Sequence, residues 1–468
     1  MVSIDALPDD ILLLIFHSYL HEEDLRPEDL TRAWQSLIHV CRRWRSVVFG
    51  SPRRLDLRLC CTHNTRSRDM LDIWPALPLD IIPRHEIFST RGLDNLVAAL
   101  KCNDRVCHIR LNLYKTSDSE LLAAMQQPFP ELTELELRWL ARMDESKVVP
   151  DSFLGGLAPN LEYLLLQGIP FPGLPKLLLS ATHLVDLILH SIPHSGYISP
   201  DAMVAVLSTL TSLKRLFLSF DSPESCPDLE TRRLPASTRS VLPVLTYLDF
   251  EGVSEYLEDL LTDIDAPQLN KLSIRFFHDS VFDTPELIRF ISRTPISTAL
   301  ENVDVEFTDS DGGTASVTFR SQKEGYIRVT FFCHRLDWLL SSLEQVCSSC
   351  LPFLSTLEGL YILDRISFTS APVEDIIENR VLWLELLHPF TAVKNLYLTE
   401  NITLRIGPAL QELVEGRATE VLPTLESIFL RGLESSGHAQ EGIERFVAAR
   451  QSASHPIAIS SWTNWSRR

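Results

Sequence analysis

A six-residue pattern of aliphatic residues constrains the fold of this chain more than any other feature of its sequence. The pattern is leucine, two variable residues, leucine, one variable residue and a last aliphatic residue. Clear copies begin at Leu132, Leu161, Leu184, Leu213, Leu245, Leu269, Leu357, Val393 and Leu425, and weaker copies begin at Val106 and Leu300. Because alternate side chains of a strand point to opposite faces, each copy predicts a short strand with one aliphatic face. The repetition favours a stacked array over a featureless α/β domain.

The spacing of the copies predicts how the array is built. Successive copies between Leu132 and Leu300 are 29, 23, 29, 32, 24 and 31 residues apart, which brackets and slightly exceeds the leucine-rich-repeat range of roughly 20 to 29. The intervening segments, such as 200–210 and 253–264, have helical periodicity. We therefore predict an α/β solenoid over residues 103–462, with a curved, mostly parallel sheet and outer helices. Most copies lack the asparagine of the regular repeat, so the array is of the irregular kind.

Three segments depart from the repeat. Residues 303–332 alternate apolar and polar side chains around the glycine pair Gly312-Gly313, which predicts a β-meander inserted into the solenoid. Residues 53–102 contain three prolines, Pro75, Pro78 and Pro83, and are predicted to connect the solenoid to the segment before it. Residues 463–468 form a short polar tail.

Residues 1–52 predict a separate helical module. A first helix begins at Pro8, a residue suited to the first helical position. A second helix carries one apolar stripe with steps of three and four residues, formed by Leu30, Trp34, Leu37, Cys41, Trp44 and Val48. Two short amphipathic helices cannot enclose a core of their own. Their remaining apolar surface must contact either the rest of the chain or a partner.

Charge and cysteine content exclude several classes of function. The chain has 62 acidic and 43 basic residues, a formal net charge of −19, which opposes binding to nucleic acid or to an anionic membrane. The sequence has no apolar run of about 18 residues that could form a membrane-spanning helix. Nine cysteines at irregular spacing do not predict a disulfide framework. We expect the protein in a reducing compartment, the cytoplasm or the nucleus.

The sequence also lacks the common signatures of catalysis. Neither the P-loop nor the dinucleotide-binding glycine pattern occurs, and there is no G-x-S-x-G nucleophile elbow. Histidines and cysteines do not complete a metal-ligand spacing. We therefore predict that the protein is not an enzyme and has no cofactor and no metal ion.

The helical module resembles a known motif. Leu7-Pro8-Asp9-Asp10-Ile11-Leu12 with Ile15-Phe16, followed by Val40-Cys41-Arg42-Arg43-Trp44 and Ser51-Pro52, is similar to the F-box. The tryptophan that often follows the last proline of the motif is missing, since Arg53-Arg54-Leu55 follows Pro52. The resemblance implies that the module binds a Skp-type adaptor and, through it, a cullin–RING ubiquitin ligase. Carried over by position, the adaptor-facing residues are Leu7, Pro8, Ile11, Leu12, Ile15, Phe16, Val40, Cys41 and Trp44.

An F-box followed by irregular leucine-rich repeats resembles a large group of fungal F-box proteins. The resemblance implies a substrate-recognition subunit of an SCF-type ligase, whose solenoid holds a protein substrate. Variable strand positions face away from the aliphatic core, and they predict the substrate-binding residues Tyr163, Arg215, Phe217, Tyr247, Lys271, Tyr361, Tyr397 and Phe429. The alternative is a non-catalytic interaction scaffold that is not coupled to ubiquitin transfer.

Overall fold

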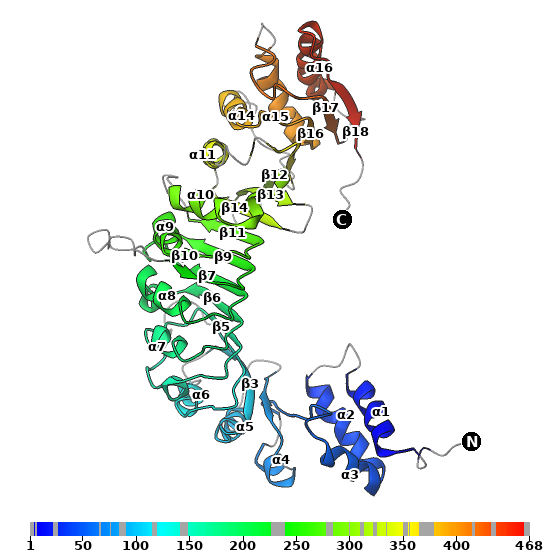
Figure 1. Cartoon of the computed structure of the whole chain (residues 1–468), viewed down its shortest axis with the longest axis vertical. Coiled ribbons are helices and arrows are strands. Elements are labelled where there is room, and N and C mark those ends of the chain that lie inside the picture. Colours follow the sequence, from blue (N-terminus) through cyan, green and yellow to red (C-terminus); the bar gives the residue numbers. More distant parts are fainter. Residues whose placement is uncertain are drawn as a thin grey trace. The chain divides into compact units, whose positions relative to one another are not determined.

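The structure is a computed structural model of the whole chain (Figure 1). It describes residues 4, 7–21, 27–64, 67–74, 76–83, 90–114, 119–140, 148–225, 239–277, 284–298, 300–308, 313–321, 325–333, 335–349, 354, 356–364, 379–413, 417–431 and 437–462. The chain divides into two compact units, which are described separately. Unit 1 is Met1–Ile198 with Ala205–Leu213, and unit 2 is Ser199–Val204 with Lys214–Arg468.

Unit 1 begins with three helices where the sequence predicted two. They are α1 (Asp9–Leu20), α2 (Pro27–Val40) and α3 (Arg42–Gly50). The predicted second helix is interrupted at Cys41, whose backbone is extended and whose thiol accepts a hydrogen bond from the Trp44 N–H. Cys41 is therefore the N-cap of α3. The unbroken apolar stripe concealed this break, because both helices contribute side chains to one core.

The sheet of unit 1 is parallel throughout the described residues. Its strands pair in chain order and are β1 (Leu59–Cys61), β2 (Leu79–Ile81), β3 (Val106–Leu113), β4 (Glu134–Trp139), β5 (Tyr163–Gln167) and β6 (Asp186–Ile192). Between the strands lie α4 (Ser67–Ile73), α5 (Thr90–Leu100), α6 (Ser119–Ala124), the 3₁₀ turns η3 (Phe153–Gly156) and η4 (His194–Gly196), and α7 (Leu174–Leu178). Helix α8 (Pro200–Leu207) has residues in both units.

The sheet begins earlier than the repeat pattern predicted. Residues 53–102, expected to be a connection, contribute β1 and β2 together with α4 and α5. These two strands are three residues long, too short to contain the six-residue pattern, which explains why it starts only at β3. The solenoid therefore starts at Leu59 and follows the helical module after a short turn.

The sheet of unit 2 has the strand order β7-β9-β11-β14-β13-β12-β15-β16-β17-β18 (Figure 1). The strands are β7 (Arg215–Phe220), β9 (Tyr247–Gly252), β11 (Lys271–Phe276), β12 (Leu300–Thr308), β13 (Thr314–Ser321), β14 (Tyr326–Phe332), β15 (Gly359–Asp364), β16 (Asn395–Leu398), β17 (Ser427–Leu430) and β18 (Ala458–Ser461). The short strands β8 (Ser240–Val241) and β10 (Ile264–Asp265) pair separately.

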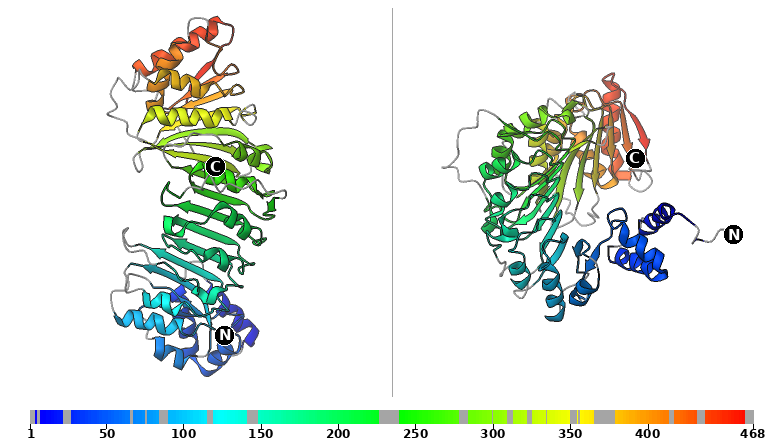
Figure 2. Two further views of the ribbon diagram at one scale, coloured as in Figure 1. Left: turned by 90° about the vertical axis from the view of Figure 1, so that its left-hand side faces the viewer. Right: turned by 60° about the horizontal axis from the view of Figure 1, so that its bottom comes forward.

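Helices of unit 2 cover one face of this sheet (Figure 2). They are α9 (Ser254–Thr262), α10 (Pro285–Ser292), α11 (Leu336–Ser349), α14 (Arg380–Leu387), α15 (Glu400–Gln411) and α16 (Gly437–Ser452), with the 3₁₀ turn η6 (Pro295–Thr298). The predicted polar tail, residues 463–468, lies outside the described residues.

The predicted β-meander consists of β12, β13 and β14, and its direction across the sheet is reversed. Strands β12 and β13 pair antiparallel, as do β13 and β14, whereas β11 pairs parallel with β14 and β12 pairs parallel with β15. After β11 the chain thus continues into β12, which lies three positions from β11 in the sheet, and it then returns toward β11 through β13 and β14. Strand β14, the last of the three in sequence, becomes the neighbour of β11.

Alternation along each strand places the core between sheet and helices. In β5, for example, Leu164 and Leu166 are buried, while Tyr163 points to the other face and is half-buried. A recurring backbone contact joins consecutive turns: the Thr246 carbonyl accepts from the N–H groups of Asn270 and Lys271, and equivalent contacts recur in both units. These contacts keep the repeats in register even though their lengths differ.

Two buried polar side chains connect outer elements of unit 2. Glu258 of α9 accepts hydrogen bonds from the N–H groups of Glu286 and Leu287, both at 2.8 Å, at the start of α10. It satisfies two of the amides that a helix N-terminus leaves unpaired.

Arg450 of α16 is also fully buried. Its guanidinium donates to the carbonyl oxygens of Ala418, Leu422, Pro423 and Leu425 at 3.1 to 3.3 Å. Burial lowers the pKa of Arg450. This side chain attaches α16 to the loop before β17.

Candidate functional site

Helix α1 carries apolar residues on two opposite faces. At 100° per residue, Leu12, Leu13, Phe16 and Leu20 cluster on one side of the helix and are buried. Ile11, Leu14, Ile15 and Tyr19 cluster on the other side and are exposed. We call this second set the α1 ridge. A short helix with a second, uncovered apolar face has surface left for a partner.

The buried face of α1 forms the core of the helical module. Leu12 and Phe16 have 0% and 1% of their surface exposed, and the ring of Phe16 packs on Trp44 with 4.7 Å between centroids. Leu12 and Phe16 were predicted to face an adaptor, and that placement is corrected by their burial. They stabilise the ridge from beneath.

The exposed face contains part of the predicted adaptor-binding set. Ile11 and Ile15 are exposed, Pro8 is exposed and Leu7 is half-buried. Leu14, which sequence reasoning missed, is the most exposed residue of the ridge at 57%. Helical spacing from Ile11 and Ile15 would have indicated it, because residues three or four apart share a face.

The second predicted ridge, at the end of α2, is divided in the same way. Val40 is 61% exposed, whereas Cys41 and Trp44 are half-buried and engaged within the module.

The opposite charges of the two ends of the module meet in ion pairs: Arg43 with Asp9 at 2.7 Å and Arg54 with Asp10 at 3.2 Å. The basic residues after residue 31 thus hold the start of α1 in place.

One backbone carbonyl connects the module to the sheet of unit 1. The Arg58 carbonyl oxygen accepts from Trp34 Nε1 at 2.9 Å and from the Thr31 hydroxyl at 3.2 Å, and the same hydroxyl accepts from the Cys60 N–H. The Arg58 guanidinium lies 3.5 Å from the Asp80 carboxylate. Because Trp34 and Asp80 are buried, the connection between α2 and the first strands is firm.

The sheet face of unit 2 opposite its helices carries two rows of polar and aromatic side chains. We call it the open face of unit 2. Following the strand order, the first row is Arg215, Tyr247, Lys271, Tyr326, Arg320, Asn302, Gly359, Asn395 and Ser427. The second row is Phe217, Asp249, Ser273, Arg328, Thr318, Asp304, Tyr361, Tyr397 and Phe429.

Three predicted residues form an aromatic stack at one end of the second row. The rings of Tyr361 and Tyr397 are 4.1 Å apart and nearly parallel, and those of Tyr397 and Phe429 are 4.5 Å apart. Trp462, which follows β18, packs edge-on against Tyr397 at 5.8 Å. Burial raises the pKa of Tyr361, so its hydroxyl stays protonated. The three rings cover one another's flat faces and remain half-buried, and Trp462 contacts Tyr397 from the side.

The middle of the open face holds buried charge. Asp249 is 4% exposed and pairs with Arg275 at 2.9 Å, and it accepts a 2.7 Å hydrogen bond from the Tyr247 hydroxyl. Asp304 is 3% exposed and pairs with Arg320. Burial raises the pKa of both carboxyls, and the two arginines oppose that effect.

The predicted substrate-binding residues fall into three groups. Tyr163 lies in unit 1, on β5 between Glu134 and Asp186. In unit 2, Arg215, Tyr247 and Lys271 are neighbours in the first row, and Phe217 lies in the second row with Arg275 5.6 Å above its ring. The stacked residues form the third group.

Sequence reasoning missed Arg320, Tyr326 and Arg328. Tyr326 and Arg328 lie beside β11 because the meander is reversed, and no local pattern indicated that reversal.

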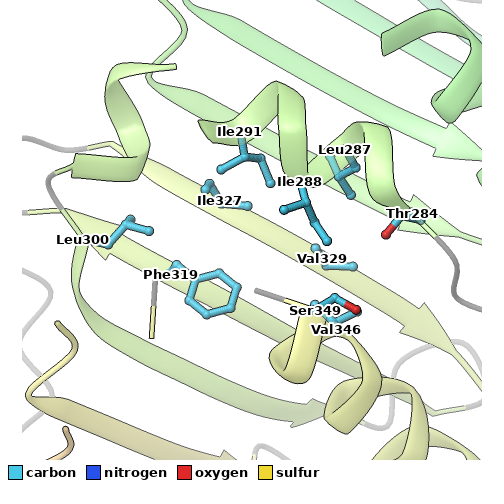
Figure 3. A pocket seen from close by; sticks show the side chains of 10 residues that line it. All are labelled: Thr284, Leu287, Ile288, Ile291, Leu300, Phe319, Ile327, Val329, Val346 and Ser349. Carbon is cyan, nitrogen blue, oxygen red and sulfur yellow. The ribbon is translucent and has the colours of Figure 1, made fainter. Parts of the chain in front are cut away.

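A small apolar recess lies on the helix side of the meander, between α10, α11 and strands β13 and β14 (Figure 3). Ile288 and Ile291 of α10 point toward Phe319 and Val329 of the sheet. The side chains that line it include no titratable group, so the recess offers neither an acid or base for catalysis nor a metal ligand.

Two further searches cover only the residues that the structure describes. Among them, no three histidine, cysteine or acidic side chains gather closely enough to hold a metal ion. None of the helices in that part of the chain is both long and apolar enough to cross a membrane.

Comparison with known proteins identifies the N-terminal module. Residues 4–61 match the family model described as F-box-like. No curated protein matches the chain. Among solved structures, the crystal structure of the leucine-rich repeat-containing protein LegL7 from Legionella pneumophila is similar at 13% identity, covering 83% of this chain and 97% of that one with a TM-score of 0.26. Because that TM-score is low, the solenoid assignment depends on the repeat pattern and strand order of this chain.

Proposed function

We propose that this F-box protein with an irregular leucine-rich-repeat solenoid is the substrate-recognition subunit of an SCF-type ubiquitin ligase. The module at residues 4–61 binds a Skp-type adaptor, and the solenoid binds a protein substrate. The protein then acts by proximity, because it raises the effective concentration of substrate lysines near the ubiquitin carrier. It supplies no catalytic group of its own.

The α1 ridge is the observation that carries this proposal. Ile11, Leu14, Ile15 and Tyr19 are exposed on the side of α1 opposite its buried face. The cost of leaving four large apolar side chains in water is offset when a partner covers them. Their position inside the F-box-like match favours the Skp-type adaptor as that partner.

The open face of unit 2 supports the second half of the proposal. Aromatic and arginine side chains are enriched at protein interfaces, and this face presents Tyr361, Tyr397 and Phe429 at one end and arginines in its middle. Half-buried aromatic rings in register on adjacent strands are more typical of a binding surface than of a sheet face in contact with water alone.

The ridge allows a test that leaves the core of the module intact. We expect the full-length protein to capture purified Skp-type adaptor, and Leu14→Glu/Ile15→Glu to weaken capture by about tenfold or more, because two exposed anchors are replaced by charge. The matched control is Ile73→Glu/Leu179→Glu, which changes two exposed apolar residues elsewhere in unit 1. Failure of the folded wild-type protein to bind adaptor would refute the proposal.

Reconstitution with a cullin–RING core separates this function from the alternative. The proposed subunit should direct ubiquitin to proteins held by the solenoid, and Leu14→Glu/Ile15→Glu should abolish that transfer. Adaptor binding without any ubiquitin transfer would instead support a scaffold that is not coupled to ubiquitination.

A further inference from the structure

The reversed meander places cationic side chains beside β11. Lys271 of β11 is in register with Tyr326 of β14, and Ser273 is in register with Arg328. On the far side of β14, Arg320 of β13 is in register with Tyr326. Lysine and arginine that are some fifty residues apart in sequence thus occupy adjacent positions on the open face of unit 2.

Two arginines of this region are already neutralised by the sheet. Arg275 lies 2.9 Å from Asp249 and 3.2 Å from Glu251, and its guanidinium also covers the ring of Phe217. Arg320 pairs with the buried Asp304. These pairs engage both buried carboxylates, and Asp304 also attracts Arg328 through space without a close ion pair.

Lys271 and Arg328 differ from those arginines. Among the residues that the structure describes, neither forms an ion pair within 4 Å, and both side chains are partly exposed. Arg328 donates from Nε to the Thr318 hydroxyl at 3.1 Å and lies 5.5 Å above the ring of Tyr326. That hydrogen bond and the ring contact fix the orientation of the guanidinium, and its terminal N–H groups donate no hydrogen bond to any residue that the structure describes.

We propose that Lys271 and Arg328, with Tyr326 between them, bind an acidic segment of a protein substrate. This inference depends on the proposed function, because it assigns the open face of unit 2 to substrate. A guanidinium held in one orientation can donate two parallel hydrogen bonds to a carboxylate or a phosphate, and a lysine adds a mobile positive charge. Carboxylate and phosphate share this chemistry, and the experiment below distinguishes them.

Charge complementarity favours an acidic partner over a neutral or basic one. The chain has a net charge of −19, so an acidic segment is repelled by most of its surface and attracted only where cations remain uncompensated. Lys271 and Arg328 are closest to that condition in this region, because among the described residues neither is held in an ion pair within 4 Å, although Asp304 attracts Arg328 from farther away. An acidic segment should therefore bind at these two cations and not elsewhere on the surface, and its affinity should fall as salt screens the charges.

The test uses the full-length protein and four labelled probes measured by fluorescence anisotropy. The first is a 12-residue peptide that alternates glutamate with serine, and the second carries phosphoserine at each serine. The third has lysine in place of glutamate, and the fourth is a ten-nucleotide oligouridylate. The variant is Lys271→Gln/Arg328→Gln, and the matched control is Arg417→Gln/Arg445→Gln, two exposed arginines elsewhere in unit 2. Thermal melting establishes that each variant is folded.

We expect the glutamate or the phosphoserine peptide to bind and the lysine peptide not to bind. Affinity should fall about tenfold or more in Lys271→Gln/Arg328→Gln, stay unchanged in the control, and decrease with salt. Preference between the two acidic peptides identifies carboxylate or phosphate as the ligand. Equal binding of the lysine peptide, unchanged affinity in the variant, tighter binding of the oligouridylate, or no binding of either acidic peptide at millimolar concentration would overturn the inference.

These measurements need no adaptor, so the two proposals can fail separately. Loss of adaptor capture with normal peptide binding would refute the ligase function and leave an acidic-segment binding site. Normal adaptor capture without peptide binding would refute this site alone.

Discussion

Glu258 offers a direct test of how successive repeats of unit 2 depend on one another. Its carboxylate is buried at the α9–α10 contact and accepts from two N–H groups of the first turn of α10. Thr284, the N-cap residue of α10, makes no side-chain cap of its own. Glu258 therefore does for α10 what a local N-cap does for most helices.

The expected effect follows from these two hydrogen bonds. A hydrogen bond to a charged group contributes about 1.5–3 kcal/mol, and a buried amide left without a partner adds a desolvation cost. Water can reach part of the vacated space after truncation, so we expect Glu258→Ala to lower the free energy of opening α10 by about 2–4 kcal/mol. Glu258→Gln should cost less, because its amide oxygen still accepts one bond.

Hydrogen exchange at the start of α10 measures this opening better than global unfolding, because repeat arrays do not always unfold in one step. A loss of about 2–4 kcal/mol corresponds to exchange at the Leu287 amide that is about 30- to 900-fold faster. The control is Glu444→Ala, an exposed glutamate on α16, which should leave α10 unchanged. If Leu287 is equally protected in Glu258→Ala and wild type, the capping role is refuted.

Three further predictions address the other buried groups. Phe16→Ala should destabilise the helical module by about 3–5 kcal/mol, whereas Ile15→Ala should change its stability by less than about 0.5 kcal/mol. Hydrogen exchange on α1 compares the two variants. Similar losses of stability would contradict the division of α1 into a buried and an exposed face. Arg450→Met should lower the free energy of opening α16 by about 2–4 kcal/mol, because four carbonyl oxygens lose their donor. Arg445→Met on the same helix should have little effect. Limited proteolysis compares the two variants, and equal resistance would refute the anchoring role of Arg450. Burial raises the pKa of Asp249 in the folded state, so this residue binds protons more tightly in the folded than in the unfolded chain, and its contribution to stability decreases as pH rises above about 4. Urea unfolding from pH 4 to 7 should therefore show a smaller decrease in the free energy of unfolding, or none, for Asp249→Asn relative to wild type. An identical pH slope for the two proteins would contradict this effect.

The repeated strands were predictable because their pattern is local. In copies such as Leu135 and Leu137, or Leu396 and Leu398, burial alternates along the strand as the aliphatic positions require. The break at Cys41 was not predictable from periodicity, since α2 and α3 bury their side chains in one core and keep the steps of three and four. Capping by the Cys41 thiol is a local hydrogen bond to the Trp44 N–H, and a count of apolar positions does not reveal it.

The candidate sites were predictable only in part. The motif located the α1 ridge. Which aliphatic residues of α1 are exposed depends on where α3 packs, so Leu12 and Phe16 were assigned to the wrong face of the helix. Tyr361, Tyr397 and Phe429 were found because each occupies the same position of its copy, and equal positions on parallel strands become neighbours. That rule fails wherever strand order departs from chain order.

The meander shows what such a departure does to a binding surface. Without β13 and β14, β12 would be the next parallel strand after β11, and its open-face residues Asn302 and Asp304 would lie beside Lys271 and Ser273. The insertion places Tyr326 and Arg328 there instead, and Arg320 between them and Asp304. The side chain in register with Ser273 is thereby Arg328 instead of Asp304, a base instead of an acid, and Asp304 pairs with Arg320 on the neighbouring strand. The insertion thus determines the sign of the local charge, on which the proposed binding of an acidic segment depends.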